Sequence, residues 1–380
     1  MKKIMFLTGS RGEWGYIRPI LSLINKRDDV DYKLIVTNMH LLPSYGSSYK
    51  EILNDGFRID HRLNMAIEAD NHYTHAKSLG VCLISLPDIL ETEKPDFLVL
   101  AGDRGEQLMG AIAASYTYTP VAHIQAGELS GNIDGMARHA IGKMTHIHFA
   151  ANQDAADRLI RLGEEPFRVH NVGAPQIDEM ISGEIADFEQ IKKGLGLSSL
   201  EKYVLAILHP VTEQAILAGD QAQIFTEALN KIDYPKILIM PNNDAGSTLI
   251  RRAIDKGRSG EYHIFSNLKR EVYLGLLSSS QCIVGNSSSG LLEAPTYKKA
   301  AVNIGRRQQG RVQGINVINV DFNVREIREA IKKATSIEFN QHLQNACVNP
   351  YGDGTSSKQI LDILLSAKID EKLLAKNLTY

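Results

Sequence analysis

The feature that most constrains the fold is a regular alternation of short apolar runs with longer segments of helical periodicity. Each run has five or six residues and is nearly continuous in apolar side chains, which is typical of strands buried on both faces. The runs occupy residues 4–9, 32–37, 97–102, 120–125, 146–151, 169–173, 203–208, 236–240, 262–266, 282–287, 300–305 and 315–320. Strands alternating with helices predict an α/β fold in which helices cover both faces of parallel sheets.

The runs fall into two series of about six, separated by a polar stretch at residues 182–202. This arrangement predicts two Rossmann-like, doubly wound domains. We expect the first domain to span residues 1–175 and the second to span residues 176–355. Within residues 356–380, Ile360, Leu361, Leu364 and Leu365 lie at helical spacing, so a C-terminal helix is expected there.

Composition narrows the possible classes of protein. The 42 basic and 44 acidic residues give a net charge of −2, which argues against nucleic acid or an acidic membrane as the main partner. The three cysteines lie far apart and match neither a disulfide framework nor a zinc site. The first apolar run is too short for a signal peptide, and no apolar stretch approaches the roughly 20 residues that a membrane helix needs. We therefore expect a cytoplasmic protein.

In open α/β sheets, ligands bind beyond the carboxyl ends of the strands, so the residues that follow each run are the first candidates for a site. Residues 8–15, TGSRGEWG, combine a glycine-rich turn with Arg11 at the start of a helix. This pattern suits an anion, and it equally suits a plain strand-to-helix turn. It is not the GxGxxG pattern of a dehydrogenase. His40 follows the second run, where it is either a ligand contact or an ordinary loop or core histidine.

Carboxylates follow the third and fourth runs. Asp103 is either the cap of the next helix or a carboxylate facing the ligand. Residues 123–134, HIQAGELSGNID, place Glu128 and Asp134 after a buried strand. These two acids are candidates for solvated loop residues, metal ligands or proton carriers. Gln125 lies at the end of the same strand.

The second half of the chain offers small, hydroxylic and basic loops instead. His209 is followed by proline, which restricts it to an extended conformation, and residues 241–247 form a polar turn. Residues 285–293, GNSSSGLLE, place small residues directly before an apolar helix, which favours anion binding over a simple serine-rich cap. Glu293 has the chemistry to accept hydrogen bonds from a ribose diol. Residues 305–311 carry three arginines beside this site.

Taken together, these segments resemble the hydrolysing UDP-N-acetylglucosamine 2-epimerases of sialic-acid-type sugar synthesis. The resemblance runs from Lys2 to about Asp362, and several motifs occur in the order that the family has. They are TGSRGEWG, TNMH, AGDRGE, HIQAGELSGNID with Arg138-His139, LHPVT, PNNDAGS, GNSSSGLLE, NIGRRQQGR and NPYGDG.

The resemblance implies two Rossmann-like domains that face an active-site cleft, as in GT-B glycosyltransferases, and a C-terminal helix that crosses back to the first domain. It implies that UDP leaves C1 of the sugar while a base removes the C2 proton. Water then adds to the resulting 2-acetamidoglucal, which gives UDP and N-acetylmannosamine. Neither a redox cofactor nor a metal is required. The resemblance also suggests a homodimer or a homotetramer.

Site residues carry over position by position. Asp103 and Asp134 match catalytic carboxylates, and Glu128 is a further catalytic candidate. His209, also a catalytic candidate, matches a histidine near the leaving diphosphate. The residues assigned to UDP binding are Arg11, Asn243, Ser287, Ser288, Ser289, Gly290, Glu293 and Arg307. The residues assigned to the sugar are His40, Gln125 and Arg138.

Gln125 departs from the family pattern, because many members have a glutamate there and a neutral amide is not a general base. Either Glu128 takes over the proton, or that glutamate is not essential in this branch. The same reaction on UDP-2,4-diacetamido-2,4,6-trideoxyglucose, of the legionaminic acid route, stays open. The sequence also leaves open a GT-B glycosyltransferase, a non-hydrolysing epimerase and a nucleotide-sugar sensor. The acids at positions 103, 128 and 134 argue against the transferase.

Overall fold

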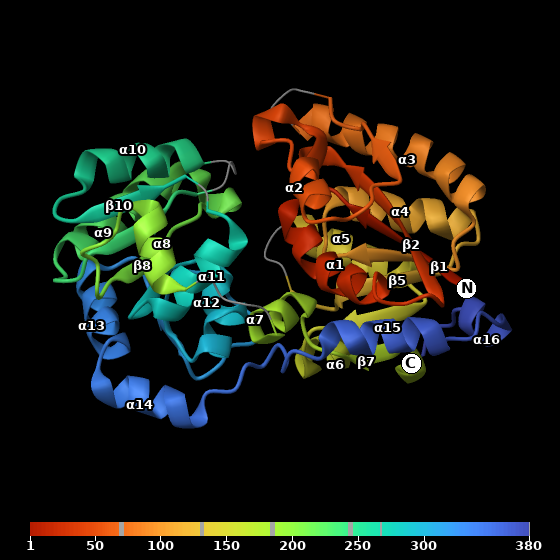
Figure 1. The fold of residues 1–380 in the computed structure, drawn as a ribbon. Coiled ribbons are helices and arrows are strands. Elements are labelled where there is room, and N and C mark those ends of the chain that lie inside the picture. The colour runs from red at the N-terminus through yellow and green to blue at the C-terminus, as the bar shows by residue number, and fades with distance from the viewer. Residues whose placement is uncertain (68–71, 130–132, 183–186, 242–245, 267, 380) are drawn as a thin grey trace. The chain divides into compact units, whose positions relative to one another are not determined.

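The computed structural model describes residues 1–67, 72–129, 133–182, 187–241, 246–266 and 268–379. The chain forms two compact units. One unit contains Met1–Glu179 together with Tyr351–Tyr380, and the other contains Met180–Pro350. Each unit is an α/β domain built on a parallel sheet, as the alternating pattern predicts (Figure 1).

The first unit holds a seven-stranded sheet with the order β3-β2-β1-β4-β5-β6-β7. Its strands are β1 (Lys2–Thr8), β2 (Val30–Thr37), β3 (His61–Leu63), β4 (Phe97–Ala101), β5 (Val121–Ala126), β6 (Ile147–Ala150) and β7 (Val169–Asn171). All neighbouring strands pair in parallel. The apolar runs do not predict β3, because it is a three-residue edge strand with two basic side chains.

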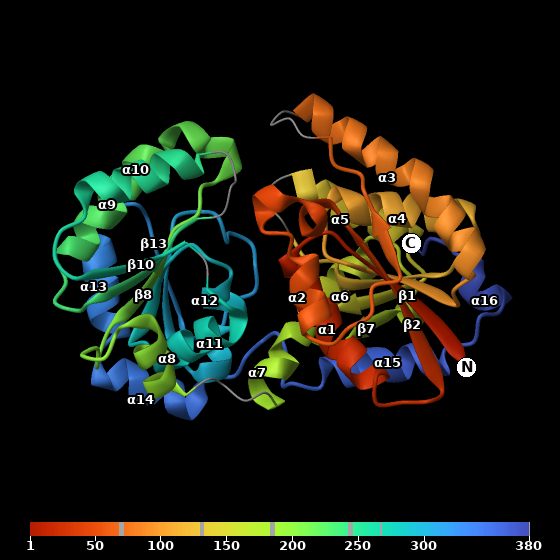
Figure 2. The same cartoon turned by 45° about the horizontal axis from the view of Figure 1, so that its top comes forward.

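Helices cover both faces of this sheet (Figure 2). They are α1 (Arg11–Ile24), α2 (Tyr49–Asn54), α3 (His72–Glu93), α4 (Gly105–Tyr116), α5 (Ile133–Met144) and α6 (Gln153–Arg161), with α7 (Asp178–Ser182) at the division between the units. Buried side chains of α1 pack on one face, and those of α3 and α4 pack on the other. No helix in the described part of the chain is long and apolar enough to cross a membrane.

The C-terminal segment belongs to the first unit, so the expected return of the last helix is confirmed. Helix α15 (Ser356–Ser366) packs on α1, and the short helix α16 (Glu371–Leu374) follows it. The buried guanidinium of Arg168 donates hydrogen bonds to the carbonyl oxygens of Lys372, Leu373 and Ala375. These bonds fasten the end of α16 and the residue after it to the first unit.

The second unit holds a six-stranded parallel sheet with the order β10-β9-β8-β11-β12-β13. Its strands are β8 (Val204–Ile207), β9 (Lys236–Ile239), β10 (Tyr262–Phe265), β11 (Cys282–Gly285), β12 (Ala300–Ile304) and β13 (Val317–Val320). Its helices are α8 (Phe188–Leu195), α9 (Ala218–Asn230), α10 (Ser247–Gly257), α11 (Arg270–Ser279), α12 (Ser289–Leu292), α13 (Val324–Ala334) and α14 (Ile337–Ala346). Helices α9, α10 and α13 pack on one face, whereas α8 and α11 pack on the other.

Both sheets share one topology around their centre. In the first sheet, strands β1 to β3 follow one another toward one edge, and strands β4 to β7 follow one another toward the other edge. In the second sheet, β8 to β10 run toward one edge and β11 to β13 toward the other. The strand order therefore reverses between β1 and β4 and between β8 and β11. Ligands bind beyond the carboxyl ends of strands at such switch points, so the two sites are expected there.

Candidate functional site

An ion pair between Asp103 and Arg138 joins the carboxyl ends of β4 and β5. Asp103 directly follows β4, and Arg138 projects from α5. One guanidinium nitrogen of Arg138 contacts the Asp103 carboxylate, and the other donates to the backbone oxygen of Gln125 over 2.6 Å. The N-cap of α4 is Arg104, so the interpretation of Asp103 as the cap of that helix is wrong. Its carboxylate is instead held at the sheet edge by a buried arginine.

Glu128 is the second described carboxylate at this edge. Its side chain is buried, and its Oε1 accepts a hydrogen bond from Asn152 Nδ2 over 2.8 Å. Burial opposes the charge on Arg138, but the carboxylates of Asp103 and Glu128 outweigh burial and raise the pKa of the guanidinium. One arginine thus interacts electrostatically with two carboxylates that follow neighbouring strands.

Gln125 occupies an irregular position at the end of β5. The pairing of β5 with β6 shifts register between Ile124 and Ala126, and Gln125 has a left-handed backbone with φ of 62°. Its side chain is buried, and its Nε2 has no hydrogen-bond partner among the described residues. Such a backbone in a non-glycine residue costs on the order of 1–3 kcal/mol and is common at functional sites. The predicted contact of this amide with the sugar stays a prediction.

His123 supports the same edge from within the strand. Its Nε2 lies 2.6 Å from the backbone oxygen of Gly102, the residue before Asp103. Burial lowers the pKa of His123 to about 3, so the ring is neutral and Nε2–H donates to that oxygen. The sequence pattern does not single out His123, because a histidine in an apolar run looks like any other strand residue.

Two buried glutamates lie beside the end of β1, and the sequence pattern does not assign them a role. Glu13 Oε2 accepts the backbone N–H of Gly9 over 2.5 Å. Glu106 Oε1 accepts from Asn38 Nδ2 over 3.0 Å and from Arg104 Nε over 3.2 Å. Burial first, and then the charge of Glu106, raises the pKa of Glu13 well above its usual range. Glu13 therefore keeps its proton to a higher pH than an ordinary glutamate does.

His40 and Arg11, both predicted to contact the ligand, have partners within the first unit. His40 is fully buried, with Nε2 3.0 Å from Thr8 Oγ1 and Nδ1 2.7 Å from Ser48 Oγ. Burial lowers its pKa to about 4, so the ring is neutral. Both ring nitrogens are thus used inside the unit. Arg11 is exposed and forms an ion pair with Glu51 in which two guanidinium nitrogens contact the carboxylate.

The serine-rich loop at residues 285–293 begins where the backbone of β11 comes very close to that of β8. Gly285 has φ of 137°, and a Cβ at this position would lie 1.8 Å from the backbone oxygen of Ile207. Only glycine fits there. The helix expected after the loop is the single turn α12, followed by a 3₁₀ turn at Ala294–Tyr297.

A hydrogen-bonded network lies under this loop. Ser289 Oγ donates to the carboxylate of Glu293 and contacts the hydroxyl of Tyr273. Arg270 Nη1 lies 3.0 Å from Glu293 Oε1. Two residues predicted to bind UDP, Ser289 and Glu293, are therefore already held in position by α11.

Asn286 connects His209, a predicted catalytic residue near the diphosphate, with Arg307, a predicted UDP contact. Its side-chain amide pairs with the backbone of His209, and its backbone oxygen accepts from Arg307 Nη1 over 3.2 Å. Asn243 and the side chain of Asp134 lie outside the described residues. Their predicted roles stay predictions.

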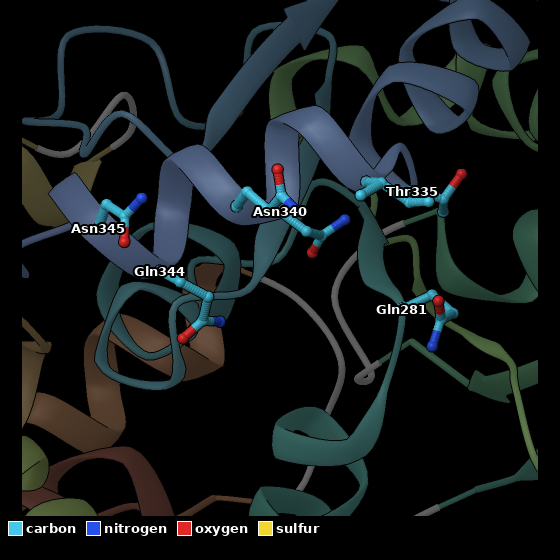
Figure 3. A pocket seen from close by; sticks show the side chains of 7 residues that line it. Gln281, Thr335, Asn340, Gln344 and Asn345 are labelled. Carbon is cyan, nitrogen blue, oxygen red and sulfur yellow. The ribbon is translucent and has the colours of Figure 1, made fainter.

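A cavity of about 570 Å³ lies elsewhere on the second unit (Figure 3). It is lined by Gln281, Thr335, Ile337, Asn340, Gln341, Gln344 and Asn345. It contains no charged side chain and none of the residues predicted for the site. Its amide lining lacks the groups that proton transfer or diphosphate binding requires, so it is not the candidate site.

Comparison with known proteins decides the family. The model of the UDP-N-acetylglucosamine 2-epimerase family matches residues 23–365. The chain belongs to this family. A UDP-N-acetylglucosamine 2-epimerase of Neisseria meningitidis is 34% identical over 337 residues, which are 89% of this chain and 88% of that relative. The hydrolysing UDP-N,N'-diacetylbacillosamine 2-epimerase of Legionella pneumophila is 34% identical over 99% of both chains.

Solved structures of 2-epimerases share the fold. The crystal structure of the UDP-GlcNAc 2-epimerase from Neisseria meningitidis, bound to UDP-GlcNAc, superposes with a TM-score of 0.81 at 21% identity. The match covers 96% of this chain and 100% of that chain. The two Rossmann-like domains predicted from the sequence are thus those of the 2-epimerase family.

Proposed function

We propose that this 2-epimerase is hydrolysing and converts UDP-N-acetylglucosamine and water to UDP and N-acetylmannosamine. The observation that carries the proposal is the group at the ends of β4 and β5. There Arg138 holds the carboxylate of Asp103 and interacts electrostatically with that of buried Glu128. Proton transfer at carbon needs carboxylates that are held in place and shielded from water.

The first half of the reaction is an elimination. A carboxylate of the first unit takes the proton from C2, the C1–oxygen bond breaks, and UDP leaves with its electron pair. The product is a 2-acetamidoglucal with a double bond between C1 and C2. We assign this step to Asp103 and Asp134. The ion pair with Arg138 favours the charged form of Asp103, which is the form that accepts a proton.

The second half is a hydration. Water adds its oxygen to C1, and C2 receives a proton on the face opposite to the one that lost it. The sum of the two halves is the cleavage of the glycosyl–phosphate bond by one water molecule with inversion at C2. A second proton-carrying group near C2 is therefore required, and Glu128 is available for it.

In this proposal, Glu128 also compensates for the glutamate that many family members have at the position of Gln125. A neutral amide at position 125 is unable to take a proton, so it serves to donate or accept hydrogen bonds to the sugar. Glu128 follows three residues later and interacts with the same arginine. We assign to Glu128 the charge that many family members carry at the position of Gln125.

We assign the binding of UDP to the second unit and to Arg11. His209 and Arg307 are placed at the diphosphate, and the loop from Ser287 to Gly290 supplies backbone N–H groups and hydroxyls. Glu293 and Asn243 complete the nucleotide contacts. Two structures of similar fold support UDP as the ligand: the UDP-GlcNAc 2-epimerase of Methanocaldococcus jannaschii in complex with UDP-GlcNAc and UDP, and S. aureus MnaA in complex with UDP.

Two substrates fit this chemistry. The polysialic acid biosynthesis protein P7 of Escherichia coli, 33% identical over 92% of this chain and 90% of that relative, supports the sialic-acid route. The Legionella relative supports the alternative, UDP-2,4-diacetamido-2,4,6-trideoxyglucose. The two sugars differ at C4 and C6, so the reaction at C1 and C2 is the same for both.

A product analysis with both sugars tests the proposal. Each UDP-sugar is incubated with the purified protein, and UDP, free sugar and UDP-sugar are separated and measured. Free UDP and free N-acetylmannosamine in equal amounts are expected from UDP-N-acetylglucosamine. A faster release of UDP from the diacetamido sugar would reassign the substrate. A 2-epimerised UDP-sugar, with no free UDP, would overturn the hydrolysing reaction.

A further inference from the structure

The side chain of Asn286 is paired with both backbone groups of His209. The N–H of His209 donates to Asn286 Oδ1 over 2.7 Å, and Asn286 Nδ2 donates to the oxygen of His209 over 2.8 Å. Asn286 is 1% exposed, so water does not compete for these two bonds. A carboxamide has one acceptor and one donor side by side, which matches the backbone groups of a single residue.

The backbone of Asn286 is engaged as well. Its N–H donates to the oxygen of Ile207 over 3.1 Å. Its own oxygen accepts from Arg307 Nη1 over 3.2 Å and from Gln308 Nε2 over 2.9 Å. Asn286 therefore connects the segment after β8 with the arginine loop after β12.

The position of Asn286 explains why such a connection is needed. Residues 207–209 and 285–286 lie where β8 and β11 end and the chain leaves toward opposite faces of the sheet. Backbone groups that lose their ladder partners at such a point need other partners when buried. Pro210 follows His209 and restricts it to an extended conformation, so a helical turn is not available to satisfy these groups.

We propose that Asn286 is a positioning residue, which sets the backbone of His209 and the place of Arg307 for contact with a nucleoside diphosphate. This inference rests on the proposed function of the same site. Asn286 acts through its neighbours: its amide is used by His209, and its backbone oxygen is used by Arg307 and Gln308. The ligand class is a nucleoside diphosphate because the two oriented groups are an imidazole and a guanidinium beside a loop of small, hydroxylic residues.

The chain contains a matched control for a purely structural role. Asn230, at the end of α9, donates from Nδ2 to the oxygen of Gly257 over 2.9 Å. Its Oδ1 accepts from the N–H of Ser259 over 3.0 Å. Asn230 thus bridges backbone groups with the same amide chemistry, but it touches none of the residues assigned to the ligand.

The experiment uses Asn286→Asp and Asn286→Ala beside Asn230→Asp and Asn230→Ala in the full chain. Asn286→Asp keeps the shape of the side chain and its acceptor oxygen. It replaces the donor Nδ2 with a second oxygen, which repels the backbone oxygen of His209. UDP affinity is measured by calorimetry, and folding is measured by circular dichroism and thermal unfolding. We expect both Asn286 variants to fold and to bind UDP about tenfold more weakly, the scale of one buried unsatisfied polar group. The Asn230 variants should bind UDP as the wild type does.

A double-mutant cycle with His209→Ala separates positioning from general stability. If Asn286 acts through His209, Asn286→Asp weakens UDP binding much less when His209 is already alanine. Equal effects in both backgrounds would overturn the proposal. So would Asn286 variants that bind UDP normally, or that fail to fold while the Asn230 variants fold. UDP binding by the wild type is independent of turnover, so an enzyme that binds UDP without hydrolysing UDP-sugars would refute the proposed function alone.

Discussion

The two switch points, between β1 and β4 and between β8 and β11, are both bridged by a buried carboxamide, but the side chains around them differ in chemistry. In the first unit, the side chain of buried Gln107 donates to the oxygen of Leu7 and accepts from the N–H of Ala101, and so ties β1 to β4. In the second unit, the amide of Asn286 ties the segment after β11 to His209 after β8. A carboxamide suits both places because it replaces one missing donor and one missing acceptor.

Beyond these amides, the two edges carry different kinds of group. The first edge is built from ionised side chains, with Arg138 between Asp103 and Glu128. The second edge is built from backbone groups, serines and Gly285, a position that only glycine fits. Buried charges need paired partners, whereas a diphosphate brings its own charge and needs N–H groups, hydroxyls and a few cations. This difference supports our proposal that bond-breaking belongs to the first edge and anchoring of UDP to the second.

Asp103→Asn is the strongest test of this division. Loss of one general acid–base group lowers turnover by at least about a hundredfold, whereas UDP binding stays unchanged because the second edge is untouched. Steady-state kinetics and UDP calorimetry measure the two quantities. Asp154→Asn, which removes an exposed carboxylate paired with Arg158, is the matched control and should retain activity. Normal turnover in Asp103→Asn would remove Asp103 from the mechanism.

Glu128→Gln sharpens the assignment within the first edge. If Glu128 carries the charge that Gln125 lacks, the variant loses about tenfold or more in turnover, with little change in UDP affinity. The double variant Glu128→Gln with Gln125→Glu returns a carboxylate to the neighbouring position and should recover part of the rate. Rates of the two variants and the wild type are compared at saturating substrate. Full activity of Glu128→Gln alone would show that the enzyme needs no carboxylate at position 128 or at position 125.

Arg307→Met probes the second edge and should give the opposite pattern. Removing one charge-assisted hydrogen bond to a phosphate costs about 1.5 kcal/mol or more, so the Kd of UDP rises about tenfold. The turnover at saturating substrate changes less. Arg325→Met, which removes an exposed arginine paired with Glu329 on α13, serves as the control. A variant with normal UDP affinity but slow turnover would break the division between the two edges.

Glu13→Gln tests the smaller effect of the buried carboxyl pair on stability. Because burial and Glu106 raise the pKa of Glu13 above its ordinary value of 4.5, ionisation destabilises the folded wild type as pH rises above that value. The stability of the wild type is therefore retained below about pH 4.5 and declines as pH rises toward the pKa in the folded state. The amide has no such decline, so the variant should gain stability relative to the wild type as pH rises toward 8.

Urea unfolding of both proteins between pH 4 and pH 8 measures this difference. The gain should vanish at the acid end, where Glu13 is neutral in both the folded and the unfolded chain. A variant that becomes less stable than the wild type as pH rises above 4.5 would contradict this account, because the folded chain would then favour the Glu13 anion.

The fold was largely predictable because its determinants are local. Twelve of the thirteen strands in the described residues coincide with apolar runs, and β3 was missed because its three residues carry two basic side chains. The contacts of the site are not local. Arg138 reaches Asp103 over 35 positions in the chain, and Asn286 reaches His209 over 77. Nothing in the pattern of residues indicates which arginine meets which acid.

The same reason explains the residues whose surroundings were unexpected. His40 follows a strand, as a ligand contact would, yet Thr8 and Ser48 from other segments use both of its ring nitrogens. Glu13 and Glu106 look like ordinary first-turn helix acids in the sequence, and only the packing of α1 and α4 around Gly9 buries them. The hydrogen-bond partners of these polar residues lie far away in the sequence. The sequence therefore predicts which strand end a polar residue follows, but not which residue it bonds.

Turnover of UDP-N-acetylglucosamine in D₂O is the most direct measurement. In the proposed reaction, a base at the first edge removes the C2 proton, and the proton returned to C2 comes from solvent-exchanged groups. Mass spectrometry and proton NMR should therefore find free UDP together with N-acetylmannosamine that carries one deuterium at C2. A UDP-sugar product, or a free sugar that keeps its original hydrogen at C2, would contradict a hydrolysing elimination and hydration.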